Sequence, residues 1–530
     1  MAISPTYPGV YVQEIDSGVR TVAGVPTSIA AMVGRTRKGP VNAPTACFNF
    51  GEFGRRFGGL WSDSTVSYVV DDFFGNGGGQ CEIVRLFRPN GGSDGIAKLE
   101  QGPLKLQAAN PGSWGNAIKV AVSHPSETDL EGAKAVAAKY GLDVNDLFDL
   151  TIIDDGTGAR EVVRNLSMKE ASGERRFDRV LAASGLVTFT PDGNGKPQFA
   201  NARPAKTADG APVAAEDGDD GQALDEATYL GDQDLKTGIH ALRNADIFNL
   251  LCIPPDDRGG TLLKSVCEAA VQLCAEERAF FIVDPPADWD QNPAEAAATA
   301  KAAQLDPAKQ VLSLTYADYA GLYFPRIVKR DRLRGGQMDV FPPCGAVAGV
   351  IARTDTERGV FKAPAGLAAT LSNIDGLTVK MTDDENGLLN PIGVNCLRSF
   401  PNIGRVVWGA RTLKGSDQLS DDYKYVSVRR LALFIEESLF RGTQWVVFEG
   451  NDEPLWAQVR LSVGTFMQRL FKQGAFQGTS PRDAYFVKCD SETTTQDDIN
   501  RGIVNIVVGF APLQPAEFVI ISIQQIRNAS

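Results

Sequence analysis

The chain has 530 residues, of which 43% are apolar and 22% charged, and its formal net charge is −12. It is too long for one hydrophobic core, because domains usually contain about 100–200 residues. The acidic balance argues against general nucleic-acid binding, which needs a basic surface. The first residues lack the pattern of a secretory signal. The sequence contains no run of about 18 apolar residues, so direct membrane insertion is not expected.

The first ninety residues have the pattern of a small α/β unit. Aromatic and β-branched residues follow a Pro-Gly pair at residues 8–9, which predicts an extended strand over residues 7–15. Further strands are predicted over 28–34 and 81–87, with a helix over 65–74 between them.

From about residue 91 to 229 the pattern changes to short strand candidates separated by polar stretches. These candidates cover residues 118–122, 147–154 and 187–190. Residues 191–225 are rich in Gly, Ala, Pro and Asp, and residues 209–226 contain seven acidic side chains and no basic one. This composition predicts a mobile, solvated loop within an insertion that lies on the surface.

An apolar strand pattern returns at residues 247–254, followed by a helix pattern over 261–277 and a strand over 279–283. This spacing suits a parallel βαβ unit with a right-handed crossover. An Ala-rich helix over 293–303 and a third strand over 310–314 would extend the same sheet.

Two amphipathic helices are predicted in the last third, over residues 426–439 and 454–473. Pro454 suits the first turn of the second helix. The apolar positions of this helix are Leu455, Val459, Val463, Phe466 and Leu470, and its opposite face holds Gln458, Ser462, Thr465, Arg469 and Lys472. Strands are predicted over 484–488, 503–510 and 517–526.

Candidate catalytic residues are few. The two histidines, His124 and His240, are far apart in the sequence, which weakens proposals of a His-based metal site or catalytic triad. The glycine run at residues 75–79 lacks the Gly-Lys-Ser/Thr ending of a phosphate-binding loop and precedes a strand, so a helix end and turn is the favoured interpretation.

Asp256 and Asp284 follow predicted strands, where α/β enzymes place catalytic groups. Neither is accompanied by a partner base, a nucleophile or a ligand loop, so the enzyme hypothesis is the less favoured one. The eight cysteines are scattered without a CxxC pair, which favours reduced thiols in the core over disulfides or metal ligands. No catalytic, cofactor or metal site is predicted.

Several separated motifs resemble those of contractile tail sheath proteins. They are the YPGVY of residues 7–11 with EI at 14–15, TSI at 27–29, GP at 39–40, FGEFGRRFG at 50–58, PCGAVAGVIARTDTERGVFKAP at 343–364, LNPIGVNCLRSFPNIGRVVWGARTL at 389–413 and FEGND at 448–452. Val394 stands where the family has isoleucine. The resemblance covers about residues 5–90 and 236–526, and residues 91–235 read as a lineage-specific decoration.

The resemblance implies a mixed α/β subunit of several domains, with a discontinuous core. The expected divisions are an N-terminal arm strand (1–24), a first core segment (25–90), an inserted β-rich outer domain (91–235), a middle α/β domain (236–334), a second core segment that forms a C-terminal domain facing a tube (335–512) and a C-terminal arm strand (513–530).

The expected function is structural and not enzymatic. Subunits of this family polymerise helically around an inner tube and contract from a metastable extended state. The family exchanges terminal strands between copies, and the resemblance transfers this role to Val10, Tyr11, Val12, Ile15, Phe518, Val519, Ile521 and Ile523. An isolated terminal strand independently favours such pairing, because its backbone groups are otherwise unpaired.

The polar face of the helix over 454–473 is the candidate tube contact, with Arg469 and Lys472 facing acidic tube residues. A simply solvated helix face is the alternative. Other expected partners are baseplate and tail-terminator proteins, and the expected location is a phage tail or contractile injection particle made in a bacterial cytoplasm. Two other hypotheses remain at this point: an α/β hydrolase or transferase using Asp256 and Asp284, and a non-contractile surface-lattice protein.

Overall fold

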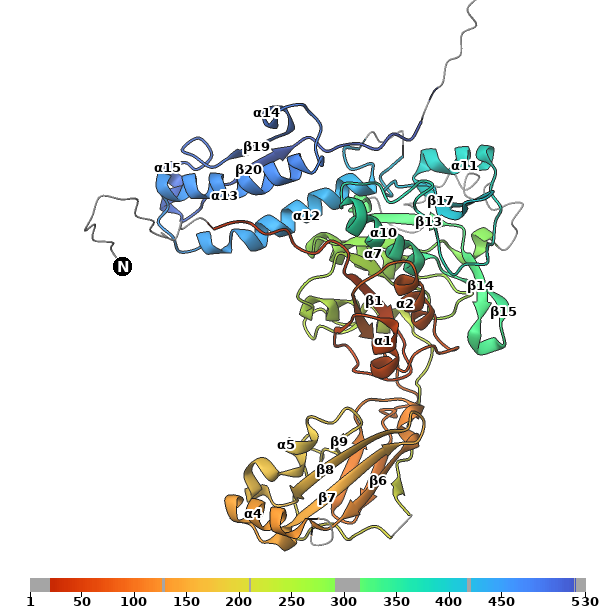
Figure 1. Ribbon diagram of the computed structural model, residues 1–530, viewed down its shortest axis with the longest axis vertical. Coiled ribbons are helices and arrows are strands. Elements are labelled where there is room, and N and C mark those ends of the chain that lie inside the picture. The colour runs from red at the N-terminus through yellow and green to blue at the C-terminus, as the bar shows by residue number, and fades with distance from the viewer. Residues whose placement is uncertain are drawn as a thin grey trace, which may run out of the picture. The chain divides into compact units, whose positions relative to one another are not determined.

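Eight strands from distant regions of the chain form one sheet (Figure 1). The structure is a computed structural model that describes residues 20–125, 129–208, 211–290, 315–416, 421–518 and 520. The order of the eight strands is β18 (Gly404–Val407), β17 (Val394–Phe400), β13 (Ala320–Phe324), β12 (Phe280–Val283), β11 (Leu250–Cys252), β1 (Ala30–Gly34), β3 (Cys81–Arg85) and β2 (Thr45–Cys47). The six inner strands are parallel, and β18 and β2 run antiparallel at the two edges.

Strand β1 lies inside this sheet because it is apolar on both faces. All five of its residues are buried, as expected for a parallel strand covered by helices on both sides. Its register places Ala30 opposite Leu250 of β11 on one side and Cys81 of β3 on the other.

Helices cover both faces of the sheet. Helix α7 (Lys264–Glu276) shares a core cluster with Leu251, whereas Cys252, one residue along β11, points to the other face and contacts the first residue of α10 (Cys344–Arg358). There α10 packs against α2 (Val66–Gly75): a Cβ atom added at Gly345 would lie 2.2 Å from the carbonyl oxygen of Val69.

Smaller elements complete this region of the chain. They are α1 (Phe50–Phe57), α6 (Glu226–Leu230), α11 (Asp383–Leu389) and a three-stranded sheet of β15 (Gln337–Phe341), β14 (Ile327–Asp331) and β16 (Gly376–Leu377).

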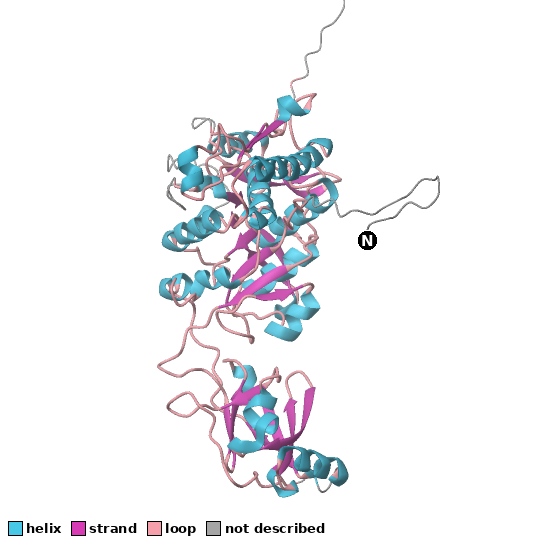
Figure 2. Cartoon of the chain, turned by 90° about the vertical axis from the view of Figure 1, so that its left-hand side faces the viewer, coloured by secondary structure: helices cyan, strands magenta, loops and turns pink. Residues whose placement is uncertain are grey.

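The residues between β3 and α6 form an inserted region of strands and helices, labelled in Figure 1 and seen from another side in Figure 2. It has its own hydrophobic core. One of its sheets has the order β10 (Val213–Ala214), β6 (Ile118–Ser123), β7 (Leu147–Asp154) and β8 (Ala159–Ser167), and the other has β4 (Lys98–Gln101), β5 (Leu104–Ala108) and β9 (Val187–Phe189); helices α4 (Leu130–Tyr140) and α5 (Phe177–Leu181) accompany them. The predicted strands at 118–122, 147–154 and 187–190 are confirmed within one residue.

The entry and exit of the insertion are joined by hydrogen bonds. The amide of Gln222 donates to the carbonyl of Arg88 at 2.9 Å, and that of Asp219 donates to the carbonyl of Gly95 at 3.1 Å. Arg88 also pairs with Asp225 at 3.1 Å. The chain therefore leaves and re-enters the core at one place.

The acidic segment predicted to be a mobile loop instead makes specific contacts over residues 211–225. Val213 and Ala214 pair with β6, and Glu216 exchanges two backbone hydrogen bonds with Lys98. Asp220 accepts hydrogen bonds from the Ser113 amide and hydroxyl at 2.8 and 2.7 Å, and Asp225 caps α6. The carboxylates act as acceptors for polar groups that would otherwise be unpaired.

Residues 1–27, 358–363 and 425–530 form a second unit, of which residues 20–27, 358–363, 425–518 and 520 are described. Its elements are α12 (Val426–Gly442), α13 (Glu453–Lys472), α14 (Pro481–Ala484), β19 (Tyr485–Lys488), α15 (Gln496–Asn500) and β20 (Val507–Phe510). Its core contains Leu431 and Ile435 from α12 and all five predicted apolar positions of α13.

Both amphipathic helices are thus confirmed, with Pro454 in the first turn and Asp452 as N-cap of α13. The predicted helix at 293–303 and strand at 310–314 lie outside the described residues, and β13 supplies the next strand of the sheet. The domain boundaries expected at 236 and 335 differ from the structure, because β11, β13 and β17 share one sheet with β1. The second unit resumes at Tyr425.

Candidate functional site

An extended segment, residues 20–27, runs along the helices of the second unit, and we call it the strap (Figure 1). The Ser462 hydroxyl of α13 donates to the carbonyl of Arg20 at 2.5 Å. On α12, the Ser438 hydroxyl accepts from the amide of Val25 at 3.2 Å, and Arg430 donates to the carbonyl of Thr27 at 2.7 Å. The strap is therefore fixed at its start, middle and end.

Two glycines allow the strap to approach α12 closely. A Cβ atom at Gly24 would lie 2.9 Å from the ring of Phe434, and one at Gly442 would lie 2.7 Å from the side chain of Val22, which is buried. The sequence analysis placed residues 20–24 in the N-terminal arm strand and did not predict their packing on α12, which these two glycines could have indicated.

Strands β19 and β20 form an antiparallel hairpin that packs on α13. Tyr485 and Val487 of β19 and Val508 and Phe510 of β20 contact the apolar core of the unit. On the opposite face, the Phe486 ring lies over Gly509, where an added Cβ atom would meet it at 2.2 Å.

The register of the hairpin determines which backbone groups point outward. The amide of Ala511 donates to the carbonyl of Ala484, so this pair is hydrogen-bonded. Hydrogen-bonded pairs alternate along an antiparallel ladder. The N–H and C=O groups of Tyr485 and Val487, and those of Val508 and Phe510, therefore point away from the partner strand. Within the described residues neither β19 nor β20 pairs with a further strand, and the only neighbouring pairing is an isolated antiparallel bridge between Phe476 and Pro512, just after β20.

Most residues predicted for strand exchange cannot be placed. Val10, Tyr11, Val12, Ile15, Val519, Ile521 and Ile523 lie outside the described residues. Phe518 is described and is 73% exposed. Glu517, one residue earlier, accepts a hydrogen bond from the Tyr425 hydroxyl at 3.2 Å.

The predicted polar face of α13 is only partly at the surface. Arg469 and Lys472 are accessible, and the Arg469 guanidinium lies 5.5 Å from the centre of the Phe466 ring. Ser462, in contrast, was assigned to the polar face but is buried, because the strap covers it.

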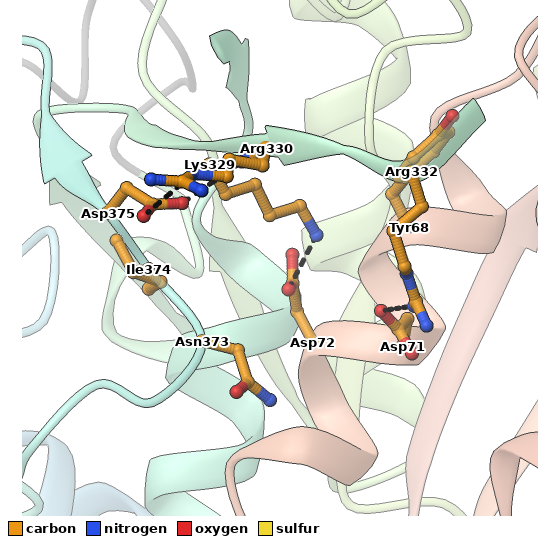
Figure 3. A pocket seen from close by; sticks show the side chains of 9 residues that line it. All are labelled: Tyr68, Asp71, Asp72, Lys329, Arg330, Arg332, Asn373, Ile374 and Asp375. Atoms are coloured by element: carbon orange, nitrogen blue, oxygen red, sulfur yellow. Dashed lines mark hydrogen bonds and ion pairs between the residues drawn. The ribbon is translucent and has the colours of Figure 1, made fainter. Parts of the chain in front are cut away.

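A cavity of about 430 Å³ lies between α2, β14 and the residues after α10 (Figure 3). Its lining residues are Tyr68, Asp71, Asp72, Lys329, Arg330, Arg332, Asn373, Ile374 and Asp375. The charged side chains form ion pairs across it: Lys329 with Asp72 at 2.6 Å, Arg330 with Asp375 at 3.6 Å, and Arg332 with Asp71. Burial raises the pKa of Asp72 to about 6, against the opposing effect of Lys329. The pairs with Asp71 and Asp72 attach the β14–β15 hairpin to α2, and the pair with Asp375 attaches it to the residue before β16.

Comparison with known proteins identifies the family. Residues 230–413 match the phage tail sheath protein central domain, and residues 418–526 match the phage tail sheath C-terminal domain, together more than half of the chain. The chain belongs to the phage tail sheath family. The tail sheath protein of Salmonella phage ViI is 27% identical over 164 residues, which are 31% of this chain and 25% of that relative.

Solved sheath structures share the fold. The sheath complex of an extracellular contractile injection system, PVC, in its contracted state aligns over 99% of both chains with a TM-score of 0.55 and 21% identity. The sheath tail protein of Listeria innocua aligns over 93% of this chain and 96% of its own, with a TM-score of 0.58 and 12% identity. The matched family domains begin at residue 230, so the expectation that residues 91–235 are specific to one lineage stays a prediction.

Two parts of the sheath motif at residues 389–413 are joined by buried hydrogen bonds. Asn395, from the GVN of β17, donates to the carbonyl of Arg411 at 2.7 Å and accepts from its amide at 2.6 Å. The fully buried Arg411 guanidinium donates to the carbonyls of Asn390 and Gly415. Buried polar groups need such partners.

The hypothesis of an enzyme centred on Asp256 and Asp284 is not favoured, because the family is a structural one. In the structure, Asp256 pairs with Arg35 at 2.9 Å and accepts from the amide of Leu224. Asp284 accepts from the Cys344 amide at 2.9 Å and so caps α10. Both carboxylates therefore have structural partners.

The structure also describes the surroundings of the remaining candidates. The ring of His124 lies 3.1 Å from the carbonyl oxygen of Pro204, and burial lowers the pKa of His240. The glycine run follows the end of α2 and turns into β3, as predicted. All eight cysteines are free and buried, which confirms the prediction of core thiols. The described residues contain no group of three or more metal-ligating side chains, and none of their helices is long and apolar enough to cross a membrane.

The strap contact can be tested with Gly24→Ala. The added methyl group must displace Phe434 or the strap, so we expect a loss of about 1–3 kcal/mol in the free energy of unfolding. Gly464→Ala is the matched control, because nothing lies within 4 Å of its Cβ position. Denaturant titration measures both, and equal stability of the two variants would contradict the close packing.

Because of Asp284, we expect the free energy of unfolding to depend on pH. Burial raises its pKa from 3.8 to about 7. Between these values the folded chain binds a proton that the unfolded chain has released, so this group's contribution to stability falls as pH rises from about 4 to 7. Asp284→Asn keeps an acceptor for Cys344 and should reduce that slope by up to about 1 kcal/mol per pH unit. Stability curves between about pH 4.5 and 7.5 span this window, and an unchanged slope would exclude Asp284 as its source.

Proposed function

We propose that the chain is the subunit of a contractile sheath, which polymerises helically around an inner tube and contracts to drive the tube through a target envelope. Membership of the tail sheath family supports this function. The assembly mechanism rests on the β19–β20 hairpin, whose two strands pair with no further strand among the described residues. The two terminal segments of the chain, predicted to be strands, could pair with such a hairpin in neighbouring copies. The particle is a phage tail or a contractile injection system, assembled after synthesis in a bacterial cytoplasm.

Strand exchange would join the copies. The outer edges offer the backbone groups of Tyr485 and Val487 on β19 and of Val508 and Phe510 on β20, and each edge can add one strand. Residues 10–15 of one neighbour and 518–523 of another are the strands we assign to these edges. Such head-to-tail contacts need not close into a ring, so they generate a helical polymer.

The strap would transmit force from the N-terminal strand to the helices. Ser462, Ser438 and Arg430 hold its backbone, so a pull on residue 20 reaches α12 and α13 through hydrogen bonds and packing. During contraction, subunits move as rigid bodies between two packings while the exchanged strands stay paired. The extended packing must be the less stable one and kinetically trapped for contraction to release energy.

The inner tube would contact Arg469 and Lys472 on the accessible side of α13. Both side chains reach the surface, and their charge suits acidic residues on a tube. Baseplate and tail-terminator proteins would bind the two ends of the polymer.

Electron microscopy of the expressed chain tests the assembly. Hollow tubes with a helical surface are expected, whereas flat or closed lattices would favour a surface-layer protein and uniform small particles would contradict polymerisation.

If neighbours add strands to the hairpin, Val508→Pro should abolish the hollow sheath polymers that the chain forms. Proline removes the outward N–H of Val508 but no hydrogen bond within the hairpin. Val508→Ala is the matched control, because it shortens the side chain and keeps the N–H, and it should still form tubes. Circular dichroism must show both variants folded; tubes from folded Val508→Pro would contradict strand addition at β20.

Charge reversal at Arg469 and Lys472 tests the tube contact. The double variant to Glu should bind the tube about tenfold more weakly, because two attractive pairs become repulsive, yet it should polymerise alone. Arg482→Glu with Arg501→Glu makes the same change in charge at exposed residues of the same unit that are not part of α13. Co-sedimentation with the tube measures binding, and equal capture by both double variants would exclude the α13 contact.

A further inference from the structure

The connection between α12 and α13 contains a strained aromatic residue. Val447 and Phe448 occupy the two central positions of a β-turn that is closed by a hydrogen bond from the Glu449 amide to the Val446 carbonyl at 3.2 Å. Val447 has φ −66° and ψ 129°, and Phe448 has φ +71°. These angles define a type II turn, whose second central position favours glycine or asparagine.

The same aromatic side chain is fully exposed. Phe448 is 103% exposed and Val447 is 63% exposed, so the turn presents an apolar corner that nothing in the described residues of the subunit covers. A residue that is both strained and exposed stabilises neither the turn nor the core. Such an outlier points to a role outside the isolated subunit.

The strap begins beside this corner. The Arg20 guanidinium lies 5.0 Å from the centre of the Trp445 ring and 4.0 Å from the carboxylate of Glu449, the residue after Phe448. Residues 15 and 20 are five residues apart and can span at most about 18 Å. If residues 10–15 join a neighbour's hairpin, that hairpin must lie within this distance of residue 20, whose side chain contacts the residues that flank the corner.

The neighbour's hairpin has an apolar face for this contact. On the side away from α13, Phe486 is 50% exposed and Val507 is 43% exposed, and glycine at 509 leaves the Phe486 ring flat on the strand. We propose that the Phe448 corner of one copy packs on the Phe486–Val507 face of the copy that receives its N-terminal strand. This proposal rests on the strand exchange proposed above and adds a second, side-chain contact to it.

The decisive variant is Phe448→Gly, because its two effects have opposite signs. Glycine adopts the positive φ without strain, so the midpoint of thermal unfolding in the dissociated subunit should rise by about 2 °C. The variant also loses the ring that the neighbouring copy would bury, so the critical concentration for polymerisation should rise about tenfold. Phe448→Leu keeps an apolar side chain and should polymerise nearly as well as the wild type.

Cross-linking tests the partner. Copies carrying Phe448→Cys mixed with copies carrying Phe486→Cys should form a disulfide-linked dimer under mild oxidation, since all eight native thiols are buried. Each variant alone should give none, and deletion of residues 1–15 should abolish the dimer together with the tubes.

Three results separate the proposals. Normal polymerisation of Phe448→Gly without the mixed dimer would overturn the Phe448 contact and leave strand exchange intact. Weaker tube capture with normal polymerisation would also overturn it, and would assign the corner to the tube. Normal tubes after deletion of residues 1–15 would overturn strand exchange itself.

Discussion

The parallel pairing of β1 with β11 is the contact on which the rest of the sheet depends. It joins residues about 220 positions apart, and it places β1 between β11 and β3. Without it, the strands before the insertion and those after it would belong to separate sheets. Every strand of this sheet has its inner edge occupied, and helices cover both faces, so the backbone groups of its inner strands are paired within one subunit.

The second unit follows the opposite principle. Its hairpin has two strands, packs one face on α13 and leaves both edges unpaired among the described residues. An isolated two-stranded sheet is marginally stable in water, and here the contact with α13 supports it. A complete sheet in one unit and an incomplete sheet in the other explain how a subunit can be folded before assembly and still require neighbours.

Local elements could be read from the sequence where the pattern was regular. Helix α13 was predicted from the spacing of Leu455 to Leu470 and from Pro454, and β1 from its continuous apolar run. Helix α10 could not be read in this way, because it is buried on most sides and contains Gly345 and Gly349, which weaken helix propensity. Those glycines are present because α2 approaches closely, which is a tertiary requirement.

The candidate site was predictable in the same uneven way. The accessibility of Arg469 and Lys472 followed from helical periodicity, but the burial of Ser462 did not, because its partner is a carbonyl 442 residues earlier in the chain. The acidic segment failed for a related reason: composition indicates solvation, whereas Asp220 and Asp225 accept hydrogen bonds from backbone amides. The strained turn at Phe448 has no signature in the sequence, since turn preferences there favour other residues.

The joined entry and exit of the insertion have a consequence for how such subunits diversify. Because Arg88 and Gln222 are one hydrogen bond apart, a domain placed between them needs only that its own ends lie close together. Domain termini often meet this condition. The inserted domain can therefore be replaced, in evolution or by engineering, with another folded domain such as an enzyme or a receptor-binding domain. The strands on either side of the insertion would keep their register.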